Sequence, residues 1–260
     1  MILLETSKVL ERGSERLIAG TVKVMCGRFT SLTPPDQVAE IFGAEPPSLA
    51  LLDEYRPHYN VAPSSRIMAV ALDGRGNRRV GIFHWGLVPG WSKDPRIGAR
   101  LINARSESVS EKPSFRSLVP TKRCIIPMAG FFEWRTNGVD PRGPKRPVYV
   151  TRRDGAVLAV AGLWTSWRDP VAGRDSPVLH SCCVITTAAN RTMAPIHDRM
   201  PVILEARDWS DWLAVGPAGT PSSRLAELMV PADDDIVVPR DVSTAVNAVR
   251  NNDPTLIDAV

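Results

Sequence analysis

The stretch Ile67-Met68-Ala69-Val70-Ala71-Leu72 is followed by Asp73-Gly74-Arg75-Gly76-Asn77 and then by an apolar run over residues 80–85. A buried apolar run, a turn rich in glycine and a second apolar run form the pattern of a β-hairpin. Similar short runs recur along the chain, at residues 123–126, 130–134, 148–152, 157–163 and 181–187. Proline, glycine and charged residues separate them, so the sequence predicts a fold built on β-sheet.

Further signals place helices and turns between these strands. Thr33-Pro34 is typical of a helix start, and Gly43 of that helix's end. Asp154-Gly155 between two apolar runs predicts a hairpin, and Pro127 is expected to separate two strands. The remaining expected elements are strands at 202–204 and 236–238 and helices at 209–213 and 223–229. The sequence therefore predicts a single β-rich α+β domain, with a mainly antiparallel twisted or barrel-like sheet and short peripheral helices.

The composition is that of a globular protein. Of 260 residues, 43% are hydrophobic and 23% are charged, and no apolar run approaches the ~20 residues of a membrane span. The net charge of +4 permits binding to a polyanion without requiring it. The four cysteines are too few for a disulfide scaffold and no CxxC occurs, which favours a reducing cytoplasm and indicates no metal or cofactor site. Cys182 and Cys183 are expected on one strand, facing opposite sides.

Residues 1–24 lack the continuous apolar region of a secretory signal, and Met25 before Cys26 resembles a start codon. We expect these residues to be a mis-assigned start or a leader that is removed. Loss of Met25 gives Cys26 a free α-amine, with a pKa of roughly 7.7–8.0, beside a thiol of pKa ~8.5 that Arg28 is expected to lower. This pair is suited to trapping an aldehyde. The alternative on this stretch alone is an ordinary buried strand cysteine.

Two further segments place an ionisable side chain in apolar or stiff surroundings. Glu133 lies among the aromatic residues of segment 130–134, where desolvation is expected to raise its pKa toward that of a general acid or base. His197 lies between two prolines and next to Asp198, which is placed to fix its tautomer or raise its pKa. The alternatives are an outward-facing strand carboxylate and a structural loop histidine.

Six motifs occur in a fixed order along the chain. They are Met25-Cys26-Gly27-Arg28-Phe29, Tyr59-Asn60-Val61-Ala62-Pro63, Trp85-Gly86-Leu87-Val88-Pro89-Gly90-Trp91, Ile102-Asn103-Ala104-Arg105, Gly130-Phe131-Phe132-Glu133-Trp134 and Ile196-His197-Asp198-Arg199-Met200-Pro201. On these motifs the chain resembles the SRAP family, the SOS response-associated peptidase or abasic site processing proteins. The resemblance assigns residues 25–251 to one SRAP domain, with residues 1–24 as a leader outside the family pattern and residues 252–260 as a C-terminal tail.

The resemblance implies a protein that binds single-stranded DNA containing abasic sites, in the DNA damage (SOS) response. Members bond to the opened abasic sugar through an N-terminal cysteine, whose amine forms a Schiff base and whose thiolate closes a thiazolidine ring. Cys26 matches that nucleophile, which the family also links to autoproteolytic removal of preceding residues. Glu133 and His197 match catalytic residues that move protons, and Asn103 matches an asparagine that orients the cysteine and the sugar. The family thus implies a crosslinking or lyase-type activity with an associated cysteine peptidase (hydrolase) activity.

The same resemblance implies a set of DNA contacts. Arginines are expected on phosphates, because a guanidinium matches phosphate oxygens, and Trp91 and Pro63 are expected against the bases that flank the lesion. The matching positions are Arg28, Asn60, Pro63, Trp91, Arg105, Thr187 and Arg199. We expect a cytoplasmic, nucleoid-associated monomer that needs no cofactor.

The chain departs from the family pattern at three places. The α-amine of Cys26 is part of an amide while residues 1–25 precede it, which blocks thiazolidine formation. Ser92 stands where some members have a second tryptophan. Pro113 stands where a basic residue is expected, with Lys112 beside it.

Two other functions stay open at this point. One is a thiol peptidase that acts on protein substrates, with Cys26 as nucleophile, His197 as base and Glu133 or Asn103 as orienter. Such an enzyme is able to use a cysteine inside the chain, whereas a thiazolidine requires the free amine. The other is a non-catalytic nucleic-acid binder, which leaves Glu133 and His197 without a role.

Overall fold

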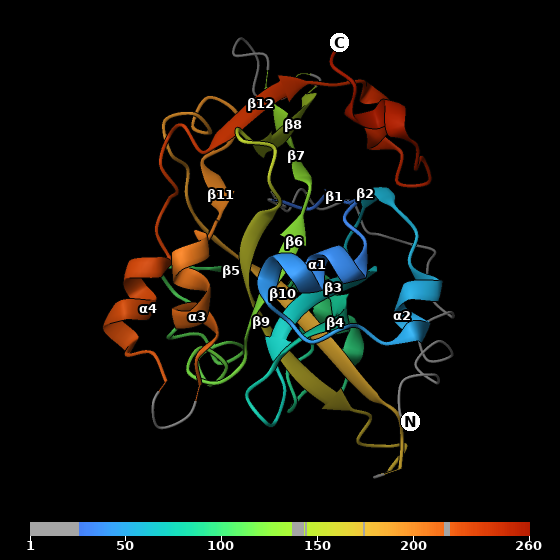
Figure 1. Ribbon diagram of the computed structural model, residues 1–260, viewed down its shortest axis with the longest axis vertical. Helices are drawn as coiled ribbons and strands as arrows, with labels where there is room; N and C mark the ends of the chain where they lie inside the picture. Colours follow the sequence, from blue (N-terminus) through green and yellow to red (C-terminus); the bar gives the residue numbers. More distant parts are fainter. Residues whose placement is uncertain (1–25, 137–142, 144, 174, 216–218) are drawn as a thin grey trace.

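A computed structural model describes residues 26–136, 143, 145–173, 175–215 and 219–260 (Figure 1). The leader, and every expectation about it, lies outside these residues. The strands are β1 (Phe29–Ser31), β2 (His58–Val61), β3 (Arg66–Leu72), β4 (Arg78–Trp85), β5 (Asn103–Arg105), β6 (Arg123–Met128), β7 (Gly130–Arg135), β8 (Arg146–Arg152), β9 (Leu158–Arg168), β10 (Val178–Ala188), β11 (Arg199–Pro201) and β12 (Val237–Asp241). The helices are α1 (Pro35–Phe42), α2 (Leu49–Glu54), α3 (Trp209–Leu213) and α4 (Ser222–Leu228), with 3-10 helices η2 (Pro95–Arg100), η3 (Ala206–Asp208), η4 (Thr244–Asn247) and η5 (Pro254–Ile257).

Five strands close into a barrel in the order β10-β4-β3-β6-β9, with β9 returning to β10. The expected hairpin forms part of its wall, because β3 and β4 pair antiparallel from Arg66↔His84 to Leu72↔Arg78. β10 continues past the barrel, where it pairs with β5 on one side and β11 on the other. The β10–β4 and β10–β5 pairs are parallel, and the rest of this sheet is antiparallel. The predicted barrel-like, β-rich fold with short helices is confirmed.

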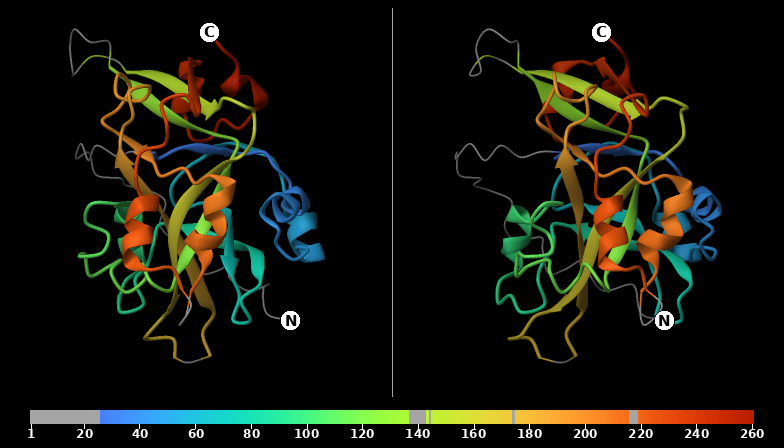
Figure 2. Two further views of the ribbon diagram at one scale, coloured as in Figure 1. Left: turned by 60° about the vertical axis from the view of Figure 1, so that its left-hand side comes forward. Right: turned by 90° about the vertical axis from the view of Figure 1, so that its left-hand side faces the viewer.

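A second sheet, in the order β12-β8-β7-β1-β2, lies at one end of the barrel (Figure 2). A small apolar core packs between this sheet and the C-terminal segment and stabilises the sheet. It is formed by Phe132, Tyr149, Val242, Val246 and Leu256. The region expected as a tail therefore packs into this sheet, and Ala259 also forms a bridge with Val242.

The barrel has apolar side chains on both faces. One core cluster, which includes Trp85, Ile126 and Cys182, packs against the second sheet. The other cluster includes Cys183 and the buried side chains of α1, α3 and α4, which cover the opposite face of the strands. Cys182 and Cys183 therefore point to opposite sides of β10, as predicted. All four cysteines are free and buried.

Two expected connections are wrong. Pro127 lies inside β6 opposite Ala159; pairing of β6 with β3 ends at Ile125, so a residue without an N–H group is tolerated there. Asp154-Gly155 forms a turn, with Gly155 at φ 75°, but it does not join a hairpin. β8 pairs with β7 and β12, while β9 pairs with β6 and β10, so the turn carries the chain from one sheet to the other.

The loop after β4 is fixed by a close approach of two glycines. A Cβ atom on Gly98 would lie 2.6 Å from the carbonyl oxygen of Gly86, and one on Gly86 would lie 2.7 Å from that of Gly98. Gly86 also has φ 137°, which side chains rarely permit. These contacts set the path of the segment that carries Trp91.

No helix among the described residues is long and apolar enough to cross a membrane.

Candidate active site

The pairing of β1 with β7 places Cys26 beside Glu133. Phe29 lies opposite Phe131, and the N–H of Phe132 donates to the carbonyl of Arg28 at 2.9 Å. Continuing this register toward the N-terminus brings Cys26 to the carboxylate that follows Phe132. The main-chain nitrogen of Cys26 donates to Oε1 of Glu133 at 2.6 Å. A sheet register thus joins two residues that are far apart in the sequence.

Burial sets the protonation of both partners. Glu133 is 3% exposed, and desolvation raises its pKa to about 7, although the N–H groups of Cys26 and Trp134 oppose the shift. Burial, together with the nearby Glu133 charge, raises the pKa of the Cys26 thiol well above its usual range. The expectation that Arg28 lowers this pKa is wrong. Its guanidinium instead donates to Oδ1 of Asn60 at 2.7 Å and to the carbonyl of Val246 at 2.8 Å.

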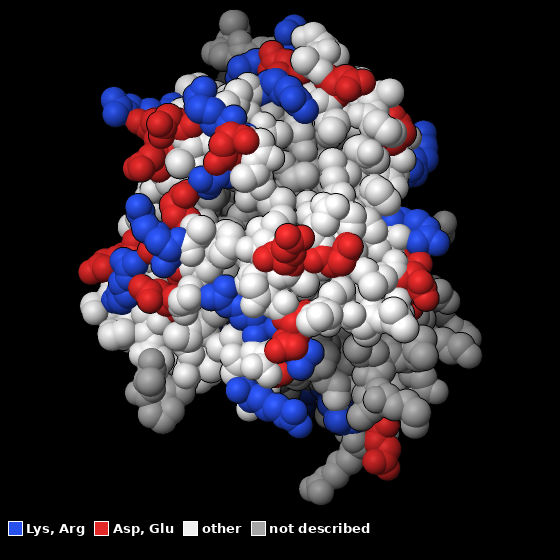
Figure 3. Space-filling view, viewed as in Figure 1, with Lys and Arg blue, Asp and Glu red and all other residues white. Residues whose placement is uncertain are grey.

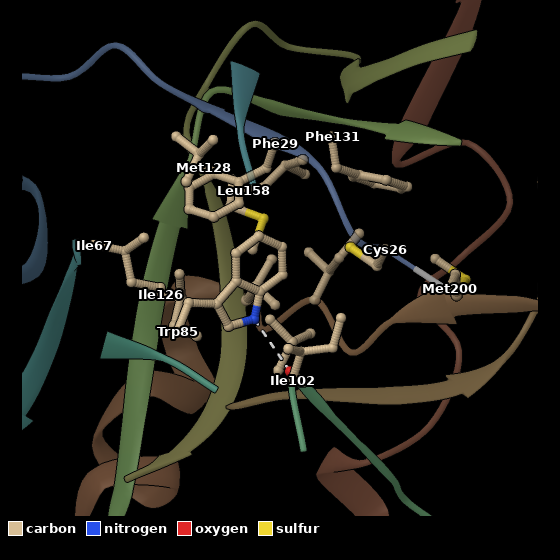
Figure 4. Close-up of a cluster of buried hydrophobic side chains, with 14 of the residues drawn as sticks. Cys26, Phe29, Ile67, Trp85, Ile102, Ile126, Met128, Phe131, Leu158 and Met200 are labelled. Carbon is tan, nitrogen blue, oxygen red and sulfur yellow. Dashed lines mark hydrogen bonds between the residues drawn. The ribbon is translucent and has the colours of Figure 1, made fainter. Parts of the chain in front are cut away.

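Cys26 lies at the edge of an apolar cluster (Figure 4). Phe131, Ile102 and Met200 belong to the same cluster, and each is followed or preceded closely by a predicted site residue. Trp85 fixes one of these segments, because its indole nitrogen donates to the carbonyl of Ile102 at 3.1 Å. The segments before β5, in β7 and in β11 therefore converge on Cys26 through their apolar neighbours.

His197 is held by its own turn. Its main-chain N–H donates to the carbonyl of Met193 at 3.0 Å. Its Nδ1 atom has two neighbours: the N–H of Arg199 at 3.1 Å and Oδ1 of Asp198 at 2.8 Å. A neutral ring accepts the Arg199 N–H at Nδ1 and carries its proton on Nε2, whereas a protonated ring donates from Nδ1 to Asp198. The turn thus supplies a partner for Nδ1 in either protonation state.

Asn103 and Asp198 are the two remaining residues of the candidate site. Asn103 begins β5, opposite Val184 of β10 and directly after Ile102 of the Cys26 cluster. The charge of Asp198 is close enough to Glu133 to raise its pKa. Among the described residues there is no group of three side chains that could hold a metal ion.

Of the predicted DNA contacts, three lie at the surface. Trp91 is 63% exposed, Arg105 is exposed and Pro63 is half-buried. Around Arg105, residues 93–122 contain seven Lys or Arg and three Asp or Glu, so this segment alone carries a net charge of +4. Five exposed cations in it have no ion pair within the described part of the chain: Lys93, Arg100, Arg105, Lys112 and Arg116. By contrast, the face that bears α1, α3 and α4 has acidic and basic groups interspersed (Figure 3).

The other predicted contacts are engaged within the protein. Asn60 is completely buried, and its Nδ2 donates to the carbonyls of Val246, Ala248 and Asn251 at 3.2, 3.1 and 2.9 Å. With Arg28 it fastens the C-terminal segment to the strands that follow Cys26. Thr187 is buried in β10. For these three residues a direct DNA contact stays a prediction.

Arg199 has a partner that sequence reasoning missed. Its two terminal nitrogens donate to the two oxygens of Glu107, with the Nη2–Oε2 distance at 2.8 Å, and Nη2 also donates to the carbonyl of Thr186 at 2.7 Å. This bond lowers the pKa of Glu107. No local pattern predicts the pair, because its members are 92 positions apart.

Comparison with known proteins shows the family of the chain. Residues 25–249 match the family described as SOS response associated peptidase (SRAP). The chain belongs to the SRAP family. It is 42% identical to abasic site processing protein YoqW of Bacillus subtilis over 90% of this chain and all of that protein. It is 30% identical to abasic site processing protein HMCES of Xenopus tropicalis, covering 91% of this chain and 78% of that protein.

Solved structures show the same fold. A crystal structure of a Bacteroides thetaiotaomicron protein superposes with a TM-score of 0.79 at 26% identity, covering 90% of this SRAP chain and all of the other. A Bordetella bronchiseptica protein gives a TM-score of 0.68 at 24% identity over 84% of this chain and all of that one, which shows the fold alone.

Proposed function

We propose that this SRAP protein, once Cys26 is its first residue, bonds covalently to abasic sites in single-stranded DNA. The observation that carries the proposal is the 2.6 Å distance between the Cys26 nitrogen and Oε1 of Glu133. In a chain that begins at Cys26, this nitrogen is the α-amine. A carboxylate at that distance is placed to take the amine's proton, and burial, which raises its pKa to about 7 in the 260-residue chain, makes it a stronger base than an exposed glutamate.

The reaction balances as one aldehyde, one amine and one thiol giving a thiazolidine and one water. The neutral amine of Cys26 attacks C1 of the opened sugar, and the carbinolamine loses water when Glu133 returns a proton to its hydroxyl. The sulfur then attacks the imine carbon, and the thiol proton passes through Glu133 to the ring nitrogen. Because burial keeps the thiol protonated, this base is required in the second step as well as the first.

The surroundings support roles for the other two predicted residues. His197 keeps its ring in place in both protonation states, so its Nε2 is suited to exchange a proton with the sugar as the ring opens. Asn103 is assigned to orienting Cys26 and the sugar, from the strand that directly follows Ile102.

Binding of single-stranded DNA is supported by the exposed groups around this site. Stacking of a base on an aromatic side chain contributes ~1–3 kcal/mol and tolerates any base, which fits the exposed Trp91. Pro63 is assigned to a flanking base and Arg105 to a phosphate. The unpaired cations of residues 93–122 extend the positive surface beyond them.

The backbone of Cys26 supports removal of the preceding residues. Its φ is 39°, in the left-handed region, which costs a non-glycine residue roughly 1–2 kcal/mol. This torsion is defined by the carbonyl carbon of residue 25, so hydrolysis of that peptide bond abolishes the strain. A peptidase acting on other proteins is less well supported, because it needs a thiol with a lowered pKa, and that of Cys26 is raised.

The proposal is tested by expressing the chain from Met25 and confirming loss of that methionine by mass spectrometry. Incubation with an oligonucleotide bearing one abasic site is expected to give a heat-stable crosslink of one protein per strand. The same oligonucleotide without the lesion, and a chain with residues 1–25 retained, are the controls. Failure of the chain that begins at Cys26 to crosslink contradicts the proposal.

A further inference from the structure

The exposed Trp91 lies at the tip of a tight turn whose two ends are buried. The N–H of Ser92 donates to the carbonyl of Pro89 at 2.8 Å, which closes a turn over residues 89–92. Pro89 and Ser92 are buried, whereas Gly90 is exposed and Trp91 is 63% exposed. The turn therefore presents one aromatic side chain at the surface while both of its ends stay inside the protein.

Both ends of this turn are bonded to buried side chains of the barrel. On one side, the N–H of Val88 donates to Oγ of Ser181 at 2.9 Å, and Ser181 is completely buried. On the other side, Nε1 of Trp167 donates to the carbonyl of Ser92 at 2.7 Å, and Trp167 is 3% exposed. Val88 and Ser92 lie outside the strands, so no sheet pairing places them. These two side-chain bonds therefore fix the turn to the barrel.

The strand register places the two anchoring side chains next to each other. Ser181 of β10 lies opposite Thr165 of β9, and Trp167 is two residues beyond Thr165. Directly opposite residues share one face of a sheet, as do residues two apart on one strand. Trp167 and Ser181 therefore point from the same face of two paired strands, and each contacts one end of the turn.

The one polar atom of the Trp167 side chain is engaged in this contact. An indole has one N–H and no acceptor, so a buried tryptophan needs a single partner. Here that partner is a main-chain carbonyl 75 positions away, in the residue directly after Trp91. The side chain of Ser92 is itself engaged locally, since its Oγ donates to the carbonyl of Asp94 at 2.9 Å. The position of Trp91 thus depends on a carbonyl that Trp167 holds.

We propose that Trp167 is a positioning residue for Trp91, and that with Ser181 it holds the turn in the conformation that receives a DNA base. The inference rests on the function proposed above, in which a base stacks on Trp91. Trp167 touches neither the DNA nor the reacting atoms. Its role is to keep Trp91 in the stacking position before DNA arrives, so that binding does not have to order the turn.

The first test measures affinity for intact single-stranded DNA in the wild type, Trp167→Phe, Trp91→Ala and the double variant. Trp167→Phe keeps a buried aromatic ring but loses the N–H. We expect it to weaken binding about fivefold, as for the loss of one net hydrogen bond. In the Trp91→Ala background the same substitution is expected to have no further effect, because the residue that it positions is absent. Crosslinking at saturating DNA is expected to stay within about twofold of the wild-type rate, since only binding is weakened.

Trp212→Phe is the matched control. Trp212 is completely buried, and its Nε1 also donates to a main-chain carbonyl, that of Cys124, at 2.8 Å. The substitution removes the same kind of bond between α3 and β6, neither of which carries a residue of the turn. We expect it to lower the thermal midpoint without changing the affinity for DNA. Ser181→Ala removes only a hydroxyl group, tests the second anchor and is expected to behave like Trp167→Phe.

The second test needs no DNA. Nitrogen-15 relaxation of the Gly90 and Trp91 amides is expected to give order parameters of about 0.85 in the wild type and in Trp212→Phe, as for rigid backbone. In Trp167→Phe and Ser181→Ala we expect values below about 0.6, with far-UV circular dichroism unchanged. This readout stands even if the wild type forms no crosslink, so failure of the proposed function is distinguished from failure of the anchor.

Two results overturn the inference. One is an unchanged order parameter at Trp91 in both Trp167→Phe and Ser181→Ala. The other, in a wild type that binds DNA, is an effect of Trp167→Phe on affinity that is the same with and without the Trp91 side chain. That result makes Trp167 a general support of the fold rather than a positioning residue.

Discussion

The carboxylate of Glu133 accepts a hydrogen bond from the main-chain nitrogen of Cys26 at 2.6 Å, and the same carboxyl group is almost completely buried. Burial raises its pKa to about 7, from an ordinary 4.5. A group so placed is suited to exchanging protons, but it weakens the fold whenever it is ionised. This conflict between activity and stability leads to the first prediction.

Glu133→Gln is expected to stabilise the protein at pH 8 and to have little effect at pH 4.5. Because the folded pKa is raised, the unfolded chain binds fewer protons between about pH 4.5 and 7, so stability falls as the pH rises through that window. A pKa of about 7 in place of 4.5 corresponds to at most roughly 3–4 kcal/mol. Urea unfolding at both pH values measures it. Equal effects of the substitution at the two pH values contradict the assigned pKa.

Cys26→Ser separates the two bonds of the proposed crosslink. A variant chain that begins at this serine keeps its α-amine, so a Schiff base with the abasic aldehyde still forms and is trapped by borohydride. Without sulfur no thiazolidine closes, and the heat-stable crosslink without reductant is expected to disappear. Denaturing gels with and without borohydride give both readings. A heat-stable crosslink from this variant would falsify the assignment of the thiol.

Arg105→Ala is expected to weaken binding to single-stranded DNA equally with and without an abasic site. Loss of one phosphate contact lowers the slope of log K against log salt by about 0.7 for a single strand. Arg207→Ala, on the face with interspersed charges, removes the same charge from an exposed side chain and serves as the control. Equal slopes for the two variants show that Arg105 makes no phosphate contact.

Gly98→Ala is expected to destabilise the loop that carries Trp91. The new methyl group would lie 2.6 Å from the carbonyl oxygen of Gly86, so one of the two backbone segments must move. We expect a loss of about 1–3 kcal/mol in the free energy of unfolding, as for overpacked interiors. Gly74→Ala, which meets nothing within 4 Å, is the control and is expected to change it by no more than about 0.5 kcal/mol. Thermal melts of the two variants decide between them.

Local patterns predicted most elements but not their partners. The helix ending at Gly43 and the hairpin of β3 and β4 follow from residues that are close in sequence, and both are present. Asp154-Gly155 does form a turn, but whether its flanking strands pair depends on β12, which takes one edge of β8 from more than 80 residues away. The residues of the turn do not indicate that β12, rather than β9, pairs with β8.

The candidate site shows the same division. Residue chemistry predicted the raised pKa of Glu133, because aromatic neighbours imply burial. The prediction that Arg28 lowers the pKa of the Cys26 thiol was wrong. The Arg28 guanidinium donates to Asn60 and to a main-chain carbonyl, and only the fold brings these two partners near. The ion pair between Glu107 and Arg199 was missed for the same reason.

The hydrogen bonds from Asn60 to three carbonyls near the end of the chain also concern the order of synthesis. These carbonyls leave the ribosome 186, 188 and 191 residues after Asn60. Until then the strands that follow Cys26 lack the segment that fastens them, and the small sheet lacks β12 and Leu256. Cys26 is thus translated long before the segments that complete the sheet beside it.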